Sequence, residues 1–256
     1  MLSEPVTSHR YKVGTHYHFA KKFLLHYQGR ELCLIEYNIS MSLTGSNSSS
    51  FWDRLLEKEI YKGDFGPMTE HRIRLAKSFK KNIGNKVLNI GSGQGFLEQE
   101  FAPDLEVMDF HSVDISRVGL ELIGKRYGTK IKKGNILNLP YKGNYFDTVY
   151  CMEVLEHVAE KDTPRAYKEI KRVTNKDGEI IISVPVNEPR SLKNHPVGHV
   201  KKYTPFSIER ELIAQGFKIT HKKLLYAFST QYEIKTFISN LTGIRKPNIA
   251  IFRCVI

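Results

Sequence analysis

The sequence of 256 residues lacks several features that would set it apart from ordinary globular proteins. Its longest apolar runs, at 180–186 and 249–256, are too short to cross a bilayer, which requires about 20 residues. The first twelve residues contain no apolar stretch typical of a secretory signal. The three cysteines, Cys33, Cys151 and Cys254, are far apart and predict neither a disulfide framework nor a zinc knuckle. We therefore expect a cytoplasmic protein with reduced thiols.

Acidic residues are in deficit, and the formal net charge is +12. Such a charge favours an anionic partner, such as nucleic acid, an acidic glycan or a lipid surface. Residues 71–86 contain six Lys or Arg and no acid, and residues 191–225 contain seven against two Glu. If these segments border the binding pocket, they favour an anionic or membrane-associated substrate. Solvated lysine-rich faces explain the same numbers equally well.

The hydrophobic content of 41% and the length fit one large domain, or one domain with an appendage. Residues 42–50, SLTGSNSSS, have the composition of a flexible linker. We therefore expect an accessory or lid segment with its linker at 1–50 and the main domain at 51–256. The leader contains four of the ten histidines, but His16 and His18 offer only two ligands and predict no metal site.

Strand and helix patterns alternate from Thr69 onward. A doubly wound parallel sheet with helices on both faces is therefore expected. Two late strands, with no helical pattern between them, predict an antiparallel pair at one edge. Strands are expected at 86–90, 110–115, 130–135, 146–152, 179–185, 217–227 and 248–256, and helices at 69–83, from about 94, at 117–128, from 162 or 163, and at 204–216.

The stretch KVLNIGSGQGF, at 86–96, runs from an apolar strand into Gly91, Gly93 and Gly95. A P-loop would need Lys followed by Ser or Thr after the last glycine, and Phe96 and Leu97 stand there instead. A dinucleotide fingerprint would need glycine where Phe96 stands. The observed spacing lets the backbone pack against an uncharged or zwitterionic ligand, outside the carboxyl end of a parallel strand.

Two polar residues follow the next strands. Asp114 lies 23 residues after Gly91, where a carboxylate can accept both hydroxyls of a ribose. The alternative for Asp114 is the N-cap of the following helix. Asn135 follows the third strand, where its amide could read an adenine amino group; the alternative is a plain turn residue.

In this order, VLNIGSGQG, VDIS, GNILNLPY, FDTVYCMEVLEHV and GEIIISVP resemble the motifs of class I S-adenosylmethionine-dependent methyltransferases. The resemblance covers about residues 70–256. EVLEHV is similar to the branch that includes quinone-biosynthesis and other small-molecule methyltransferases. The resemblance implies S-adenosylmethionine as cofactor. It also implies a mostly parallel, seven-stranded Rossmann-like sheet with an antiparallel C-terminal strand.

The resemblance also implies roles for individual residues. The glycine loop would line the methionine end of the cofactor, Asp114 would hold the ribose, and the residues at the end of the fourth strand would lie beneath the sulfonium. The family often has acids where Asn89 and Asn135 stand, and the loss of charge at Asn89 predicts weaker binding of the methionine ammonium. The implied cofactor residues are Asn89, Gly91, Ser92, Gly93, Gly95, Asp114, Ile115, Asn135, Ile136, Cys151, Met152 and Glu153.

Methyl transfer from a sulfonium needs mainly collinear positioning, and a hydroxyl acceptor also benefits from a general base. The candidate bases are His199, in the loop after the fifth strand, and His157, in EVLEHV; structuring roles are the alternative for both. His195 and His199 are four residues apart, but Pro196 excludes a helix interior and no acid is adjacent. No metal site is expected.

The first functional hypothesis is methylation of an oxygen, nitrogen or carbon of a small metabolite, such as a quinone-like ring, a sugar or a secondary metabolite. The alternative is a tRNA or RNA methyltransferase that uses the basic faces. The sequence CMEV stands where an Asn-Pro-Pro-Tyr/Phe motif would hold a flipped base, which argues against the alternative. A catalytically silent subunit is a third hypothesis, and the intact glycines and Asp114 argue against it.

Overall fold

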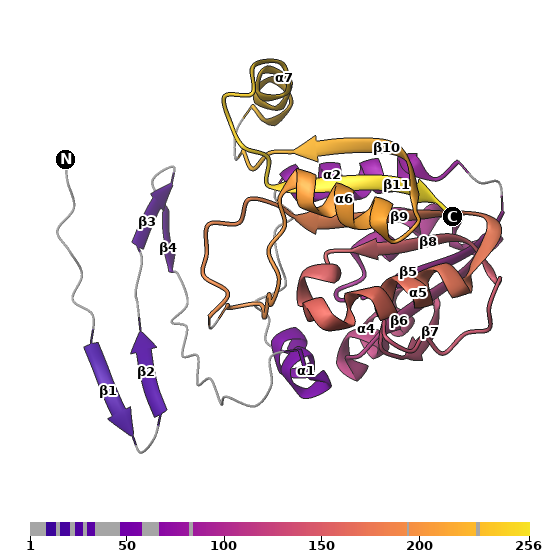
Figure 1. Cartoon of the computed structure of the whole chain (residues 1–256). Helices are drawn as coiled ribbons and strands as arrows, with labels where there is room; N and C mark the ends of the chain where they lie inside the picture. Colours follow the sequence, from indigo (N-terminus) through magenta and orange to yellow (C-terminus); the bar gives the residue numbers. More distant parts are fainter. Residues whose placement is uncertain are drawn as a thin grey trace. The chain divides into compact units, whose positions relative to one another are not determined.

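The computed structural model divides the chain into two compact units, residues 1–45 and 46–256 (Figure 1). This division falls before the boundary expected at residue 50, because Ser49 and Ser50 already begin a helix of the second unit. Residues 42–46 of the expected linker lie outside the described residues. The structure describes residues 9–13, 16–20, 24–27, 30–33, 47–57, 67–81, 84–193, 195–228 and 231–256.

The first unit contains two small antiparallel sheets. In one, β1 (His9–Val13) pairs with β2 (His16–Ala20). In the other, β3 (Leu24–Tyr27) pairs with β4 (Arg30–Cys33). The accessory or lid role expected for this unit stays a prediction.

The second unit is built on one sheet with the strand order β10-β11-β9-β8-β5-β6-β7. All neighbouring strands from β9 to β7 are parallel, whereas β11 is antiparallel to both β9 and β10. The expected mostly parallel sheet with an antiparallel C-terminal strand is therefore confirmed. The strands are β5 (Lys86–Ile90), β6 (Asp109–Asp114), β7 (Lys130–Lys133), β8 (Phe146–Met152), β9 (Thr174–Pro185), β10 (Lys218–Leu225) and β11 (Ile249–Val255).

Helices cover both faces of this sheet (Figure 1). The helices are α1 (Ser49–Glu57), α2 (Pro67–Phe79), α3 (Phe96–Phe101), α4 (Arg117–Tyr127), α5 (Thr163–Val173), α6 (Pro205–Ala214) and α7 (Tyr232–Thr242), with 3-10 turns η2 (Ala102–Val107), η3 (Leu155–His157) and η4 (Glu160–Asp162). Among the described residues, none of these helices is long and apolar enough to span a membrane. The sequence predicts that this helix continues to residue 83, but α2 ends at Phe79, since Lys80 and Lys81 are not helical; residues 82–83 lie outside the described residues.

Two hydrophobic cores hold the helices on the sheet. Because successive side chains of a strand point to opposite faces, Ile180 and Ile182 pack in one core and Ile181 in the other. The first core includes residues of α5 and α6, and the second includes residues of α2 and α3. The apolar run of β9, broken only by the buried Ser183, thus reflects burial on both faces of the sheet.

The expected antiparallel pair of late strands, β10 and β11, is confirmed. The prediction that no helix lies between them is wrong. Helix α7 lies there, and its apolar residues Ile234, Phe237 and Leu241 have the i, i+3, i+7 spacing of a helix face. Their exposed fractions are 63%, 69% and 76%, so this apolar face is not covered by the described part of the domain.

Candidate functional site

A cavity of about 600 Å³ lies where β5, β6 and β8 end. The carboxyl ends of neighbouring parallel strands meet at one edge of a sheet, which is the usual ligand site of such folds. The cavity is lined by Asn47, Trp52, Leu56, Arg72, Ile73, Asn89, Ile90, Gly91, Ser92, Gly93, Gln94, Phe96, Leu97, Val113, Asp114, Ile115, Gly134, Asn135, Ile136, Leu137, Met152, Glu153, Val154, His157, Val158, Ala159, Asp162 and Val200.

The glycine loop forms one wall of this cavity. Gly91 has φ +70°, and a Cβ atom there would lie 2.4 Å from Cγ2 of Val154. Gly93 has φ +53°, and a Cβ atom there would meet only the Gly91 carbonyl oxygen, at 4.0 Å. The buried hydroxyl of Ser92 has no hydrogen-bond partner among the described residues. The loop therefore presents bare backbone and one unused hydroxyl to a ligand. Gly95, with φ +79°, is the N-cap of α3 and does not line the cavity.

Asp114 joins the second strand to the glycine loop. Its Oδ2 accepts a hydrogen bond of 2.9 Å from the Gly93 N–H, and its Oδ1 accepts one of 2.8 Å from the Ser116 N–H. Burial raises the pKa of this carboxyl, against the opposing effect of the two hydrogen bonds. The N-cap of α4 is Ser116, whose side chain accepts from the Gly119 N–H. Asp114 itself is therefore not the cap, and each of its oxygens keeps a second lone pair for a ligand hydroxyl.

Asn135 lies in the cavity wall, together with the apolar side chains of Ile115 and Ile136. Its Oδ1 accepts a hydrogen bond of 2.9 Å from the Leu137 N–H, so the turn role weighed for Asn135 is present in the structure. The amide group keeps its two N–H donors, and its contact with adenine stays a prediction.

Asn89 borders the cavity, and behind it stands a carboxyl group that the sequence analysis missed. The Nδ2 of Asn89 donates a hydrogen bond of 2.9 Å to Oε1 of Glu98, in α3, and the hydroxyl of Ser112 donates one of 2.6 Å to the same oxygen. Glu98 is fully buried, and burial raises its pKa. An acid therefore adjoins position 89, but burial favours its neutral form.

The end of β8 brings Met152 and Glu153 to the cavity, whereas Cys151 is fully buried in the core and does not line it. Glu153 has φ +56°, a backbone conformation that costs a non-glycine residue roughly 1–3 kcal/mol. Its Oε1 accepts from the Ser183 hydroxyl at 2.8 Å, and its Oε2 lies 3.0 Å from Nη1 of Arg72. Arg72, from α2, thus places a guanidinium in the cavity wall. The sequence analysis counted this residue only among the six basic residues at 71–86.

Helix α1 forms a further wall, built from residues that the composition assigned in part to a linker. The Nδ2 of Asn47 donates hydrogen bonds of 3.0 Å to the carbonyl oxygens of both His157 and Gly198. Trp52 packs edge-on against the His157 ring, with 4.8 Å between the ring centroids. Helix α1 also reaches the residues predicted to hold the nucleoside, since the Ser49 hydroxyl donates a hydrogen bond of 2.7 Å to the Ile115 carbonyl oxygen. The start of the main domain therefore covers one side of the cavity, from His157 to Ile115.

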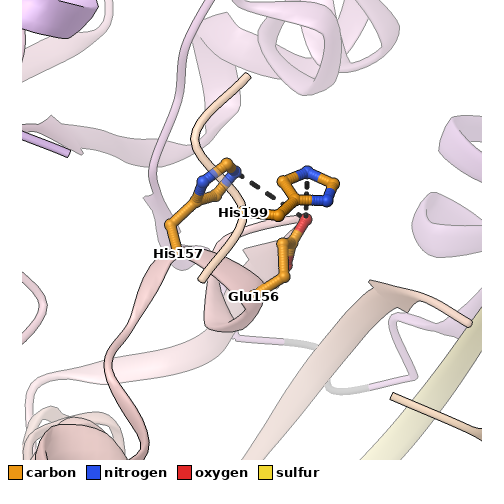
Figure 2. A group of neighbouring side chains, drawn as sticks. All are labelled: Glu156, His157 and His199. Carbon is orange, nitrogen blue, oxygen red and sulfur yellow. Dashed lines mark ion pairs between the residues drawn. The ribbon is translucent and has the colours of Figure 1, made fainter. Parts of the chain in front are cut away.

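The two predicted catalytic histidines lie side by side at this end (Figure 2). His157 borders the cavity, whereas His199 is buried and does not. The Nε2 atoms of both rings lie 3.9 Å from Oε1 of Glu156, which is also fully buried. Burial, followed by the charge of His199, lowers the pKa of His157 to about 3, so this ring is neutral at pH 7.

A second carboxylate, Glu188, holds two histidines from the other side. Its Oε2 lies 2.8 Å from Nδ1 of His199, and its Oε1 lies 2.9 Å from Nε2 of His195. Burial would raise the pKa of Glu188, but the hydrogen bonds and charges of the two histidines outweigh it and lower the pKa. No acid adjoins His195 or His199 in sequence, yet folding brings Glu156 and Glu188 to them.

A model of the family described as "Methyltransferase domain" matches residues 88–182. The uncharacterized protein MJ0638 of Methanocaldococcus jannaschii is 32% identical over 163 residues, which are 62% of this chain and 67% of that protein. The uncharacterized methyltransferase YdaC of Bacillus subtilis is 24% identical over 108 residues, 41% of this chain. The chain spans 59% of the length of YdaC.

The crystal structure of a protein described as a SAM-dependent methyltransferase, from Archaeoglobus fulgidus, has the same fold. It superposes with a TM-score of 0.57 at 17% identity, covering 78% of this chain and 98% of that chain. The residues of the cavity fit an adenosyl sulfonium, since the Gly93 backbone is bare, the Ser92 hydroxyl is unused and the Asp114 carboxylate has free lone pairs. The chain belongs to the class I S-adenosylmethionine-dependent methyltransferases and uses S-adenosylmethionine as its cofactor.

Proposed function

We propose that this enzyme transfers the methyl group of S-adenosylmethionine to an oxygen, nitrogen or carbon of a small metabolite, such as a quinone-like ring, a sugar or a secondary metabolite. The observation that carries the proposal is the cavity itself. Its volume of about 600 Å³ lies within the usual range for small-molecule sites, roughly 300–1,000 Å³. It runs from the glycine loop to His157, and α1 covers one side of it, from His157 to Ile115. The resemblance of EVLEHV to the quinone-biosynthesis branch supports this substrate class.

The cofactor roles follow from the cavity wall. Ser92, Gly93 and Asn89 would face the methionine end, and Arg72 would meet its carboxylate. Asp114 would accept the ribose hydroxyls, and Ile115 and Ile136 would pack on the adenine beside Asn135. Met152 and Glu153 would lie beneath the sulfonium, while Gly91 and Gly95 shape the loop and Cys151 fills the core below it.

When bound, the cofactor supplies a methyl group already activated as a sulfonium. The enzyme's own task is to hold an acceptor atom in line with it, and such positioning is worth on the order of 7–11 kcal/mol. His157 borders the acceptor end of the cavity, and His199 lies directly behind it. We place both histidines in the catalytic machinery on this geometry.

The alternative is an RNA methyltransferase that uses the basic faces. Several of the basic side chains in those faces are paired in the structure. Lys77 contacts Asp104 at 2.7 Å, Lys201 contacts Glu211, and Lys222 contacts Glu209 at 2.6 Å. These ion pairs reduce the positive charge available to a phosphate backbone and favour the small metabolite. A steep salt dependence of RNA binding would favour RNA instead.

The described cysteines, Cys151 and Cys254, are buried free thiols. Free thiols are typical of a reducing compartment and support action in the cytoplasm.

The test has two steps. Calorimetric titration with S-adenosylhomocysteine establishes cofactor binding, and mass spectrometry of metabolite extracts incubated with isotope-labelled cofactor identifies the methylated product. We expect label in a small organic molecule. Label that appears only in the RNA fraction, and is removed by ribonuclease, would overturn the proposal.

A further inference from the structure

We propose that Glu156, His157 and His199 bind a divalent metal ion at the acceptor end of the cavity. Glu156 and His157 come from η3, and His199 comes from the loop between β9 and α6. In Figure 2 the two interaction lines from the histidine rings meet at one oxygen of Glu156. The three ligand atoms all lie within 4.8 Å of one another. The proposal that an ion binds here does not depend on the proposed function. Only the catalytic role of the ion rests on that function.

The hydrogen bonds of each ring show which nitrogen carries the proton. Nδ1 of His157 lies 3.3 Å from the carbonyl oxygen of Gly198, which can only accept. Nδ1 of His199 lies 2.8 Å from a carboxylate oxygen of Glu188, which also accepts. In the neutral imidazole, both protons are therefore on Nδ1, and both Nε2 lone pairs point toward Glu156.

Three electron-pair donors thus converge with no hydrogen bond between them. The two Nε2 atoms are each 3.9 Å from Oε1 of Glu156, too far for a hydrogen bond. The other carboxyl oxygen, Oε2, is buried and has no partner among the described residues, although Glu156 is only 1% exposed. A buried polar atom without a partner is costly. A cation between the three groups would bind Oε1 and the two Nε2 atoms, and bidentate binding by the carboxylate would also satisfy Oε2.

The distances suit a metal after a small contraction. Zinc binds imidazole nitrogen and carboxylate oxygen at about 2.0–2.2 Å, which places tetrahedral ligand atoms about 3.3 Å apart. The two 3.9 Å separations therefore need to close by about half an ångström, and the separation between the two Nε2 atoms, which is at most 4.8 Å, by at most about 1.5 Å. Rotation of the two imidazole side chains supplies movements of this size. The two rings lie at 75° to each other, so they are not stacked and both nitrogens can aim at one point.

The surroundings of the ligands resemble the support that metal-binding histidines usually have. Such histidines donate their second ring N–H to a carboxylate or a backbone carbonyl, which fixes the ring and its tautomer. Glu188 serves His199 in this way, and the Gly198 carbonyl serves His157. Trp52 packs against the His157 ring from the side of α1.

The neighbouring group of Glu188, His195 and His199 is a weaker candidate. Nδ1 of His195 accepts a hydrogen bond of 3.3 Å from the His199 N–H, so the proton of this ring is on Nε2, facing Glu188. His195 therefore has no free lone pair for a metal, and both oxygens of Glu188 are occupied. Glu188 and His195 act as supports of His199.

Two imidazoles and one carboxylate favour a borderline cation such as Zn²⁺ over Mg²⁺ and Mn²⁺, which prefer oxygen ligands. Three protein ligands leave a coordination position for an oxygen of the acceptor. The acceptor hydroxyl, bound there, would lose its proton to solvent more readily. Its oxygen would then bond to the methyl carbon as the carbon–sulfur bond breaks, with that electron pair remaining on sulfur.

The test measures Zn²⁺ binding to chelator-treated full-length protein by calorimetry and elemental analysis, with Mn²⁺, Mg²⁺ and Ca²⁺ as further probes. The variants are Glu156→Gln, His157→Gln and His199→Gln, with His221→Gln, an exposed histidine, as control. We expect each of the three to lose one bound Zn²⁺ relative to the control. Glu188→Gln should weaken Zn²⁺ binding about 10–100-fold.

All of the variants keep the histidines of residues 1–45, so any Zn²⁺ bound there contributes equally to each protein and cancels in the comparison with the control. Unchanged melting temperature and S-adenosylhomocysteine affinity show that a variant is folded. Equal Zn²⁺ binding in the control and the three variants, with intact folding, would overturn the metal site. Zinc binding without any methylated product would support the metal site and contradict the proposed function. Turnover that is unaffected by removal of the metal with a chelator would contradict the catalytic role of the ion.

Discussion

The Oδ2 atom of Asp114 accepts a hydrogen bond of 2.9 Å from the backbone N–H of Gly93. This contact joins two motifs that are 21 residues apart in the chain and makes them one binding surface. It also means that the loop conformation and the carboxylate position depend on each other. Changes at either residue should therefore be visible in cofactor affinity.

Asp114→Ala should weaken binding of S-adenosylhomocysteine by at least about 10–100-fold, because hydrogen bonds to a charged group are worth roughly 1.5–3 kcal/mol. The calorimetric dissociation constant is the measurement. Asp53→Ala is the matched control, since Asp53 accepts a hydrogen bond from Ser116 nearby but does not line the cavity. An Asp114→Ala variant with near-normal affinity would contradict the ribose assignment.

Gly93→Ala should weaken binding of the same ligand and also destabilise the fold. Both effects arise because φ is +53° and the added methyl group would face the cavity. The control is Gly128→Ala, where φ is +69° and no atom lies within 4 Å of the added group. Chemical denaturation should show a similar loss of about 1–2 kcal/mol in both variants. Equal ligand affinity in both would show that the Gly93 backbone does not contact the cofactor.

Glu98 should make the free energy of unfolding fall as pH rises. Burial raises its pKa in the folded protein above the unfolded value, so the folded state binds the proton more tightly. Its stabilising effect is present below the unfolded pKa and is lost as pH rises through the folded pKa. Glu98→Gln keeps an acceptor for Asn89 and Ser112 but removes the titration.

Denaturation of the two proteins across pH 4–9 measures this difference. The stability of Glu98→Gln relative to the unsubstituted protein should increase with pH. The nearby carboxyl of Asp114 also has a raised pKa, but it titrates in both proteins and cancels in the comparison. A stability difference that does not change with pH would show that Glu98 ionises normally in the fold.

Most of the sheet could be predicted from the sequence because the central strands β5, β8 and β9 are largely buried and β5, β6 and β7 end in turns with distinct residues. The largely exposed edge strand β10 has neither feature. The apolar run of β9 is a local signal of a strand, and the glycines after β5 are a local signal of a turn. The order of the class I motifs along the chain then predicts the order of the strands. Helix α7 also carries a local signal, in the spacing of Ile234, Phe237 and Leu241. Its apolar residues are exposed, and the residues that it buries are Tyr232, Thr236 and Ser239, so the apolar pattern does not mark the buried face.

Asp114 and the glycine loop, which we propose hold the cofactor, could be singled out from the sequence for the same reason, since the loop follows a strand directly and Asp114 ends one. The acceptor end could not be singled out in this way. Glu156 and Glu188 are 32 residues apart, and His199 joins them only through a loop closure that spacing does not encode. Likewise, α1 contributes Trp52 to the cavity from a segment whose preceding Ser-rich composition is typical of a linker.

Arg72→Met should weaken binding of S-adenosylhomocysteine about 10–100-fold, because a charge-assisted hydrogen bond to the methionine carboxylate would be lost. Arg72 lines the cavity, pairs with Glu153 at 3.0 Å, and its buried Nε has no partner within the described part of the chain. Arg74→Met is the matched control on the same helix, since Arg74 pairs with Glu70 on the exposed surface. Adenosine, which lacks the methionine group, should bind Arg72→Met and the control equally. A parallel loss of adenosine affinity in Arg72→Met would place its effect on the shape of the site and not on the methionine end.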